Sequence, residues 1–455
     1  MGTAEVDDKK TQARAPRVGF QTGRKHWAAP EPVTGTYYHP RVASLLTRRS
    51  LLLYGGALSL TACERTTAPD RAIDAAWHRQ ALVDGVLAHW LKGSPRPSGL
   101  FNLHFAHDWT PKLETPARLD LTAQGRMIYS MIIGYELTKN RAYLDAATRG
   151  TRFLLERFHD PVHGAFFHVV GEDGTVIADR KRTYAEAFAL LALSHMGRVT
   201  GEQAYKSAAL TAWQEISQGL LDTQGGFIEV TTRDFKPEST ARTQNPVMHM
   251  FEALMALVDA TDDPRARASA RALGDFVINQ LMQGLADGSA CIPEWYDEHW
   301  KPLPTRDKGG YIELGHQFEW VHLLIRGSQL GLSPVYAAVA ERLLQYALKV
   351  GYDEIDGGAF DRTYPDGGMD RGKGYWQQCE CLHALIAAAS VDERRELWRR
   401  YEQTLTLVQK QFIDARTGGW YAKACRDGVC MDQEQPEPYH MVSLHRAALQ
   451  AAGAL

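Results

Sequence analysis

The sequence contains little cysteine and no recognisable set of metal ligands. Its six cysteines are scattered over 455 residues, without a Cys-x-x-Cys pair or a His-rich zinc pattern. We therefore predict no metal site. Only Cys425 and Cys430 are near neighbours within one expected hairpin, where an oxidising compartment could join them. A disulfide and two separate thiols are both compatible with this spacing.

An excess of charge of one sign is also absent. The chain has 51 Lys and Arg against 54 Asp and Glu, which gives a formal net charge of −3, and it carries no sustained basic stretch. Nothing therefore favours nucleic acid as a partner. A hydrophobic fraction of 44% with 23% charged residues is typical of a soluble globular protein that buries a large core. We expect a small ligand with little or no charge.

The first 63 residues contain the one targeting signal. Arg48 and Arg49 precede the apolar stretch Leu51–Ala62, which ends in Leu-Thr-Ala before Cys63. A stretch of about a dozen residues is too short to cross a hydrocarbon core of about 30 Å, but it suits the apolar part of an export signal. The alternative is a chance Arg-Arg pair before a buried helix. We predict a twin-arginine leader over residues 1–63, lipidation of Cys63, and export to the periplasmic side, with the lipid as the only membrane contact.

After residue 70 the sequence repeats itself with a period of about 65 residues. Long amphipathic segments alternate with glycine-rich, aromatic connections such as 163–174, 225–235 and 357–367, which have the composition of short β-hairpins. The expected helices are 73–92, 117–138, 141–158, 182–198, 202–220, 245–260, 264–283, 316–330, 334–350, 375–389, 392–412 and 438–452. Six helical hairpins with similar linkers predict an all-α fold, an (α/α)6 barrel over residues 64–455, with an open solenoid as the structural alternative.

In such a barrel the N-terminal ends of the inner helices meet around one funnel. Six distinctive residues occupy equivalent places at these ends: Arg126, Tyr184, His249, His316, Trp376 and His440. Asn245, Glu319, Trp320, Gln378 and Glu380 lie within one helical turn of one of these positions. Any one of the 17 histidines is more often a structural residue than a catalyst. The six residues named above share one position in the repeat. Independent structural roles would not require this shared position, so it favours a common site.

These segments resemble the superfamily of N-acylglucosamine 2-epimerase, D-mannose isomerase and cellobiose 2-epimerase. The motifs are Gly315–Trp320 (GHQFEW), Asn245–Leu254 (NPVMHMFEAL), Tyr375–Glu380 (YWQQCE), Pro438–His440 (PYH), and the segments that begin at Arg126 and Tyr184. The resemblance covers nearly the whole chain after residue 70. It implies the same (α/α)6 barrel. It also implies that His316 and His440 are paired catalytic histidines, His249 a further active-site histidine, Glu319 their associated carboxylate, and Arg126 a ligand of substrate oxygen.

The chain departs from the acylglucosamine epimerases at two points. Val247 stands where those enzymes tend to have a histidine, and His440 is followed by Met441-Val442-Ser443 in place of a Val-Pro-Arg run. Features typical of cellobiose epimerases are also missing. We therefore expect a monosaccharide substrate, bound by Arg126, Tyr184, Asn245, Trp320, Trp376, Gln378 and Glu380.

The chemistry that these residues suggest is proton transfer at the carbon beside an aldehyde. A base with a pKa near 7 can remove the C2 proton of a ring-opened aldose if the developing oxyanion is stabilised, here by Arg126 and the helix N-termini. Return of a proton to C1 of the cis-enediol gives a ketose, and return to the other face of C2 gives the epimer. We expect an isomerase of the mannose/fructose type, with a 2-epimerase as the alternative. His440 is the expected base, His316 its partner, and His249 an aid to ring opening; no cofactor is required.

Two other functions fit parts of the pattern. The same barrel hosts inverting glycoside hydrolases, in which two carboxyl groups, here Glu319 and Glu380, would lie about 6.5–9.5 Å apart. The helix ends are richer in histidine than such a reaction requires. A non-catalytic sugar-binding lipoprotein would need only the tryptophans.

Overall fold

The computed structural model describes residues 73–115, 117–392, 394–425 and 434–455. The chain divides into two compact units, Met1–Thr67 and Ala68–Leu455, and all described residues belong to the second. The twin-arginine leader and Cys63 lie outside the described residues, and so does Cys430, so the export signal and a Cys425–Cys430 disulfide stay predictions. No helix in the described ranges is both long enough and apolar enough to span a bilayer.

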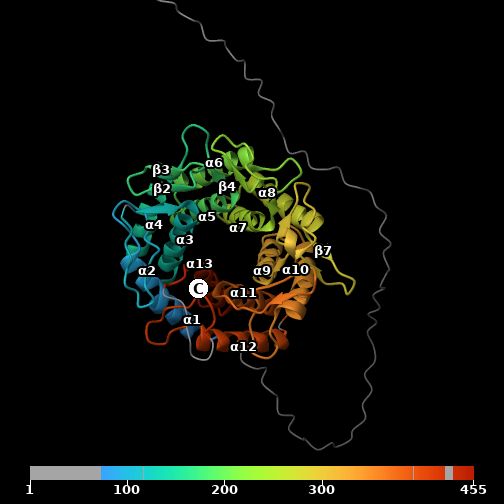
Figure 1. Ribbon diagram of the computed structural model, residues 1–455. Helices are drawn as coiled ribbons and strands as arrows, with labels where there is room; N and C mark the ends of the chain where they lie inside the picture. The colour runs from blue at the N-terminus through green and yellow to red at the C-terminus, as the bar shows by residue number, and fades with distance from the viewer. Residues whose placement is uncertain (1–72, 116, 393, 426–433) are drawn as a thin grey trace, which may run out of the picture. The chain divides into compact units, whose positions relative to one another are not determined.

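The second unit is built from two concentric layers of helices (Figure 1). The inner layer contains α3 (Leu121–Thr138), α5 (Thr183–Thr200), α7 (Gln244–Thr261), α9 (Leu314–Gln329), α11 (Tyr375–Asp392) and α13 (Tyr439–Ala451). The outer layer contains α1 (Ala75–Leu82) with its continuation α2 (Ala88–Gly93), α4 (Arg141–Phe153), α6 (Gln203–Leu220), α8 (Pro264–Phe276), α10 (Val335–Tyr346) and α12 (Arg395–Gln411). Each outer helix packs against an inner partner. The helices agree with the predicted segments to within a few residues at each end.

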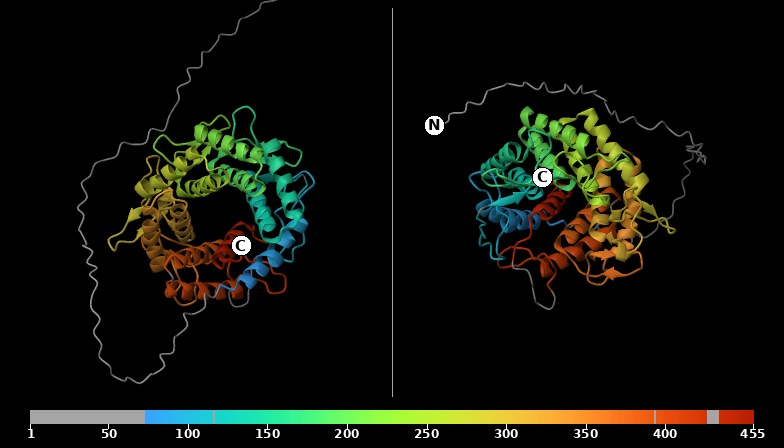
Figure 2. Two further views of the ribbon diagram at one scale, coloured as in Figure 1. Left: turned by 180° about the vertical axis from the view of Figure 1, so that it is seen from behind. Right: turned by 45° about the horizontal axis from the view of Figure 1, so that its top comes forward.

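The last inner helix closes the ring. Helix α13 packs against α11 on one side and against both α1 and α3, from the start of the unit, on the other. Figure 2 shows the same closed circle of helices from behind and from a tilted direction. The fold is therefore the predicted (α/α)6 barrel, and the open solenoid alternative is wrong.

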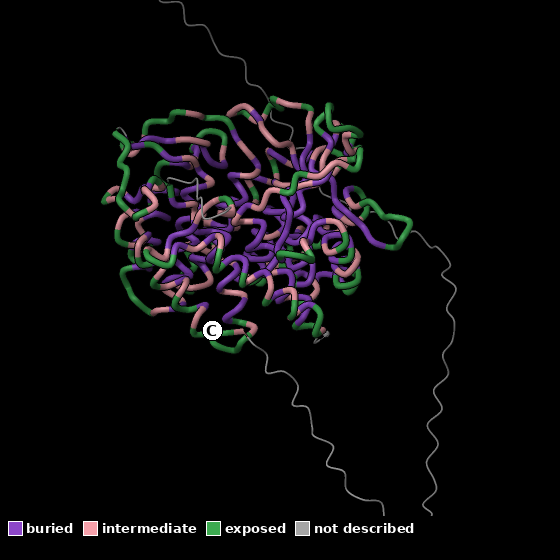
Figure 3. The backbone as a smooth tube through the Cα atoms, turned by 60° about the horizontal axis from the view of Figure 1, so that its bottom comes forward, coloured by how far each residue is buried: buried purple, intermediate pink, exposed green. Residues whose placement is uncertain are grey.

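The two layers differ in how their sequences are patterned, because they are buried to different extents (Figure 3). Inner helices are covered on all sides, so that Leu190, Leu191, Ala192 and Leu193 of α5 are all buried in succession. The outer helix α12 buries only one stripe, with Leu397, Tyr401, Thr404 and Val408 three or four residues apart. Burial of the stripes against the inner layer places the core between the two rings.

Short β-strands tie neighbouring repeats together at the N-terminal ends of the inner helices. The strands are β1 (Arg118–Asp120), β2 (Val169–Gly171), β3 (Val176–Ala178), β4 (Lys181–Arg182), β5 (Val230–Thr231), β6 (Arg242–Thr243), β7 (Gln283–Gly284), β8 (Ala290–Cys291), β9 (Trp295–Tyr296), β10 (Ile312–Glu313), β11 (Arg362–Thr363) and β12 (Met369–Asp370). All pairs are antiparallel, and the strand before an inner helix pairs with the next connection, as in β1–β2, β4–β5, β6–β9 and β10–β11. Residues 118–120, predicted as helix, are strand because they pair with β2.

A buried amide or carboxyl group anchors most inner helices to their connections. It lies at the fourth residue of the helix: Gln124 in α3, Glu186 in α5, Gln317 in α9 and Gln378 in α11. Gln317 accepts from the backbone N–H of Ile292 at 2.8 Å and donates to its carbonyl at 2.9 Å. In α7 the same place is taken by Val247, which has no polar group to offer. These contacts hold the helix ends in a common register, and so they fix the height of the residues that line the funnel.

Candidate active site

A cavity of about 460 Å³ opens where the N-terminal ends of the inner helices converge. Of the residues predicted for the site, it is lined by Arg126, Tyr184, Asn245, His249, His316, Glu319, Trp376 and His440. The helical spacing explains this gathering, because residues four apart lie on one face. Asn245 and His249 share such a face in α7. The structure therefore brings most of the predicted site residues into one cavity.

His316 is part of a buried ion pair with Glu294, a residue outside the helix-end pattern of the sequence. Its Nδ1 lies 2.7 Å from Oε2 of Glu294, and Nε2 of Gln244 lies 2.8 Å from the same carboxylate oxygen. Burial by itself would lower the pKa of His316, but the charge and hydrogen bond of Glu294 outweigh it and raise the pKa to about 9. Burial opposes ionisation of Glu294, yet His316 keeps its pKa below the ordinary value. His316 is therefore an imidazolium at neutral pH.

His440 has the opposite protonation state. Burial lowers its pKa well below the ordinary value, and the positive charge of Arg126 adds to this effect. Its Nδ1 lies 2.7 Å from Oε1 of Glu380. Burial raises the pKa of Glu380 well above its ordinary value, with a further contribution from the charge of Glu252. His440 is therefore a neutral imidazole whose Nε2 is free to accept a proton.

The ring of Trp376 lies beside both of these histidines. Its ring centroid lies 5.0 Å from that of His316 and 5.7 Å from that of His440. The two histidines thus lie beside one aromatic ring within the cavity, one charged and one neutral. Two titratable groups whose pKa values are pushed apart in this way suit an acid and a base.

His249 lies deeper and is held by a carboxylate. Its Nδ1 lies 3.1 Å from Oε2 of Glu252, whose oxygens also accept a hydrogen bond of 2.6 Å from the hydroxyl of Tyr439. Burial lowers the pKa of His249 to about 4, although Glu252 opposes the shift. The imidazole is therefore neutral, and its Nδ1–H is directed at Glu252.

Arg126 provides the fixed positive charge of the cavity. Its guanidinium donates to Glu437 at 3.1 Å and to the hydroxyl of Tyr184 at 2.6 Å. It also lies over the ring of Phe188 at 4.2 Å. These contacts hold the group in one orientation, so that it can meet a negatively charged oxygen without rearrangement.

Several buried polar atoms around the cavity have no hydrogen-bond partner among the described residues. They are Nε of Arg126, Oδ1 of Asn245, Oε2 of Glu319 and Oε1 of Glu437. Burial raises the pKa of Glu319 well above its ordinary value, so that its carboxyl group is protonated and can donate. A buried donor or acceptor without a partner is costly. A ligand rich in hydroxyl groups would supply the missing partners.

Three residues predicted to bind substrate do not line the cavity. Trp320 is fully buried and donates from Nε1 to Gln244 at 2.6 Å, behind the ion pair of His316. Gln378 is one of the helix anchors, bonded to both the N–H and the carbonyl of Ala359 at 2.8 and 2.9 Å. Glu380 lies behind His440. These residues were predicted because they are close to the site residues along the helix. Trp320 and Gln378 lie on helix faces that point away from the cavity, into the surrounding protein.

The site contains residues that the repeat pattern did not reveal. Glu294 and Trp295 belong to the connection before α9, and Glu437 precedes α13 in a Pro-Glu-Pro-Tyr segment. Equivalent helix ends recur in every repeat of the sequence, whereas these residues lie in the connections. A carboxylate next to an aromatic residue inside a connection is the signal that would have identified Glu294.

Two groups of described residues are compact enough to suggest a cation site: His249 with Glu252 and Glu319, and His322 with Glu380 and His383. In the first group Glu252 already receives hydrogen bonds from His249 and Tyr439. In the second the two imidazole rings stack, with centroids 3.7 Å apart and an angle of 11° between their planes. The in-plane lone pairs of stacked rings run side by side and do not converge on one point, so neither group forms a ready ligand set.

Comparisons with known proteins identify close likenesses over most of the barrel. The family model of N-acylglucosamine 2-epimerase matches residues 103–443. A D-mannose isomerase of Marinomonas mediterranea is 28% identical over 77% of this chain and 90% of its own length. A cellobiose 2-epimerase of Eubacterium cellulosolvens is 23% identical over 79% of this chain and 94% of its own. The structure of a cellobiose 2-epimerase from Spirochaeta thermophila has the same fold, with a TM-score of 0.76 and 22% identity over 86% of this chain and 99% of that one.

Proposed function

The chain belongs to the N-acylglucosamine 2-epimerase family of sugar isomerases and epimerases, and we propose that it interconverts an aldose and a ketose of the mannose and fructose type. The observation that carries this proposal is the pair of histidines beside Trp376, one neutral and one charged. A reaction that removes and returns a proton at adjacent carbons needs one base and one acid, and this pair supplies both.

The proposed reaction begins with a hexose in its ring-opened form, assisted by the neutral imidazole of His249. Nε2 of His440 then takes the proton from C2, and the electron pair of the C–H bond forms the C1–C2 double bond of a cis-enediol. The imidazolium of His316 and the guanidinium of Arg126 stabilise the oxygen on which negative charge develops. Return of the proton from His440 to C1 yields the ketose, while a proton moves from O2 to O1 with His316 as carrier. Every group then has its original proton.

The cavity favours a monosaccharide. Its volume of about 460 Å³ lies in the lower part of the range of small-molecule sites, about 300–1,000 Å³. The unpartnered atoms of Asn245, Glu319 and Glu437 would meet hydroxyl groups of the sugar. Trp376 would lie against its carbon face.

Epimerisation at C2 is the second candidate. It is favoured by the presence of two histidines beside the same aromatic ring, since an epimerase needs a second group to deliver the new proton. The alignment with the cellobiose 2-epimerase of Eubacterium cellulosolvens covers 79% of this chain and 94% of that protein. The two reactions share the enediol and differ only in the carbon that is protonated.

A glycoside hydrolase is not favoured. Glu380, one of the two carboxyl groups that such a reaction would use, is held between two histidines and does not line the cavity. Membership of an isomerase family also argues against a protein that only binds sugar.

The experiment is an incubation of the purified protein with mannose, glucose and fructose in turn, with the products identified by chromatography. Interconversion of mannose and fructose is the expected result. Formation of glucose from mannose without fructose would favour the epimerase. In deuterium oxide, label at C1 of fructose marks the isomerase, and label at C2 of glucose formed from mannose without fructose marks the epimerase. No conversion of any of these sugars would contradict the proposed substrate class.

We further propose that the protein acts outside the cytoplasm, anchored by lipid on Cys63. The support is the sequence alone: Arg48 and Arg49, the short apolar stretch, and the Leu-Thr-Ala-Cys ending. Twin-arginine export carries folded proteins, which suits a barrel that closes by contact between its first and last helices.

A further inference from the structure

A second cavity of about 530 Å³ lies at the opposite end of the inner helices. Its lining residues come from the C-terminal halves of the inner helices and include His195, Arg198, Glu252, His322, His383 and Arg446. We call it the rear cavity and the one described above the front cavity. It has no part in the proposed reaction, and its histidines are not among the motifs discussed above.

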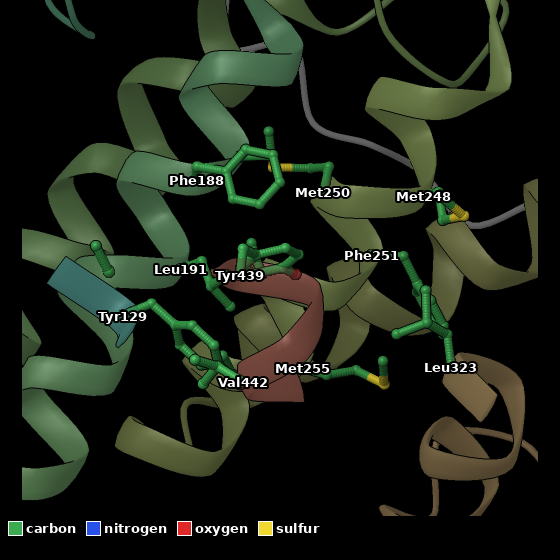
Figure 4. Close-up of a cluster of buried hydrophobic side chains, with 14 of the residues drawn as sticks. Tyr129, Phe188, Leu191, Met248, Met250, Phe251, Met255, Leu323, Tyr439 and Val442 are labelled. Carbon is green, nitrogen blue, oxygen red and sulfur yellow. The ribbon is translucent and has the colours of Figure 1, made fainter. Parts of the chain in front are cut away.

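Buried aromatic and aliphatic side chains, among them Tyr129, Phe188 and Tyr439, cluster together inside the ring of helices (Figure 4). Phe188 contacts His249 of the front cavity at a centroid distance of 4.7 Å and Tyr439 at 5.1 Å. Tyr439 contacts Tyr129, which lines the rear cavity, at 5.5 Å. A continuous series of aromatic contacts therefore runs from the lining of the front cavity to that of the rear cavity.

One chain of hydrogen bonds crosses from the proposed base to the rear cavity. Nδ1 of His440 lies 2.7 Å from Oε1 of Glu380, and the second oxygen, Oε2, lies 2.7 Å from Nε2 of His322. His322 lines the rear cavity. Because its Nε2 is occupied by Glu380, Nδ1 is the nitrogen left for water there. A second crossing, from His249 to Glu252, does not include His440.

From this arrangement, and resting on the proposed function, we propose that Glu380 and His322 form a proton relay that connects His440 to water in the rear cavity. When Nε2 of His440 takes a proton from the substrate carbon, its Nδ1 proton passes to Oε1 of Glu380. The proton on Oε2 of Glu380 passes to Nε2 of His322, and Nδ1 of His322 releases its proton to water. One proton enters and one leaves, and all three groups remain neutral with their protons on the other side. The reverse sequence resets them.

The electrostatic surroundings suit a relay of neutral groups. Glu380 is protonated because burial, and then the nearby carboxylate of Glu252, raise its pKa. Burial lowers the pKa of His322 to about 4, against a raising effect of Glu252. His383, stacked on His322, also has a lowered pKa from burial and bonds through Nδ1 to Ser443 at 3.3 Å. Arg446 and Arg198 face the same cavity and are paired with Glu136 at 3.8 and 2.7 Å. No group beside the relay therefore holds the proton permanently.

The relay lets His440 take the C2 proton without becoming a buried cation, because its Nδ1 proton leaves as Nε2 gains one. The proton from C2 stays on Nε2 and returns to the product, while the protons that move through Glu380 and His322 are others. When the exit of the Nδ1 proton is blocked, His440 must carry a charge in a site where burial disfavours it. The value of kcat is therefore the quantity that reports on Glu380 and His322.

The test compares kcat and KM for mannose in the wild type and in two variants. His322→Gln keeps an amide oxygen that can accept from Glu380 but cannot pass a proton from one ring atom to another. We expect kcat to fall at least tenfold while KM changes by less than threefold. His195→Gln is the matched control, since His195 lines the same cavity but bonds to Arg198 and not to Glu380. Unchanged kcat in His322→Gln, or an equal fall in His195→Gln, would overturn the relay.

A second measurement needs no turnover. In protein labelled with ¹⁵N at histidine, we expect His322→Gln to shift the ring nitrogen signals of His440, because the two are coupled through Glu380, whereas His195→Gln leaves them in place. The same signals unmoved in His322→Gln would refute the relay even in an active isomerase. A protein that shows the coupling but converts no sugar would refute the proposed function alone.

Discussion

Nδ1 of His316 lies 2.7 Å from Oε2 of Glu294, and this contact decides which of the two catalytic histidines carries a charge. His316 and His440 are equally enclosed, and burial lowers the pKa of both. Only His316 has an ionised carboxylate against it, since Glu380, the partner of His440, is neutral. The assignment of acid and base follows from the partners and not from the histidines themselves.

The first prediction concerns Glu294→Gln and the pH profile of kcat/KM. Because the pKa of His316 is raised to about 9, its charged form is present below that pH and is lost as the pH rises through it. We expect wild-type activity to fall above pH 9. Removal of the Glu294 charge leaves burial as the main influence and moves this alkaline limb to lower pH. Glu215→Gln, which removes the carboxylate of another His–Glu pair, is the control. An unmoved limb in Glu294→Gln would show that His316 is not the titrating acid.

The second prediction concerns the two histidines as a unit. Loss of one general acid or base typically costs about 10²–10⁴-fold, so His316→Ala and His440→Ala should each lose most turnover. Both side chains line a cavity, so circular dichroism and the thermal midpoint should show folded protein. The double variant should be far less impaired than the product of the single effects. A folded double variant that converts sugar at the native rate would contradict proton transfer altogether.

The same variants determine the order of the steps. If His440 removes the C2 proton, exchange of that proton with solvent deuterium disappears in His440→Ala and persists at a reduced rate in His316→Ala. The opposite pattern would assign the base to His316.

The repeat pattern of the sequence was sufficient to predict the ring of helices and the end at which the site lies. Inner helices bury all their faces and therefore appear in the sequence as continuous apolar segments. Outer helices bury one stripe and therefore appear as apolar residues three or four apart, and both patterns can be recognised in a single sequence. The register of the inner helices then follows from the repeat. For this reason Arg126, His249, His316 and His440 could be assigned to one cavity.

The direction of individual side chains could not be predicted in the same way. Gln378 lies two residues from Trp376, and a rotation of about 200° about the helix axis separates them, so one faces the connection and the other the cavity. Glu294 reaches His316 from a connection whose path depends on the pairing of β6 with β9. Contacts between segments distant in sequence decide both cases, and a single sequence does not encode them in a periodic form.

The third prediction concerns the leader. Replacement of Cys63 by Ala should leave a precursor that is exported but not lipidated, because the thiol is the group that receives the lipid. Replacement of Arg48 and Arg49 by a Lys pair should keep the precursor in the cytoplasm. Fractionation and the mass of the mature chain measure both effects. Normal maturation of the two variants would contradict an exported lipoprotein.

The fourth prediction separates Trp376 from Gln378, two neighbours in α11 with different roles. Trp376→Ala removes the aromatic ring beside the histidines, so KM for the sugar should rise and kcat should fall, while the free energy of unfolding changes little. Gln378→Ala leaves the N–H and carbonyl of Ala359 without their buried partner, which costs about 1–3 kcal/mol for each group left unsatisfied. It should therefore lower the denaturation midpoint in urea with KM close to that of the wild type. Because both variants are made in the same turn of one helix, general damage to α11 would affect stability and KM together in each. If KM rises in Gln378→Ala as much as in Trp376→Ala, Gln378 binds substrate and its purely structural role is wrong.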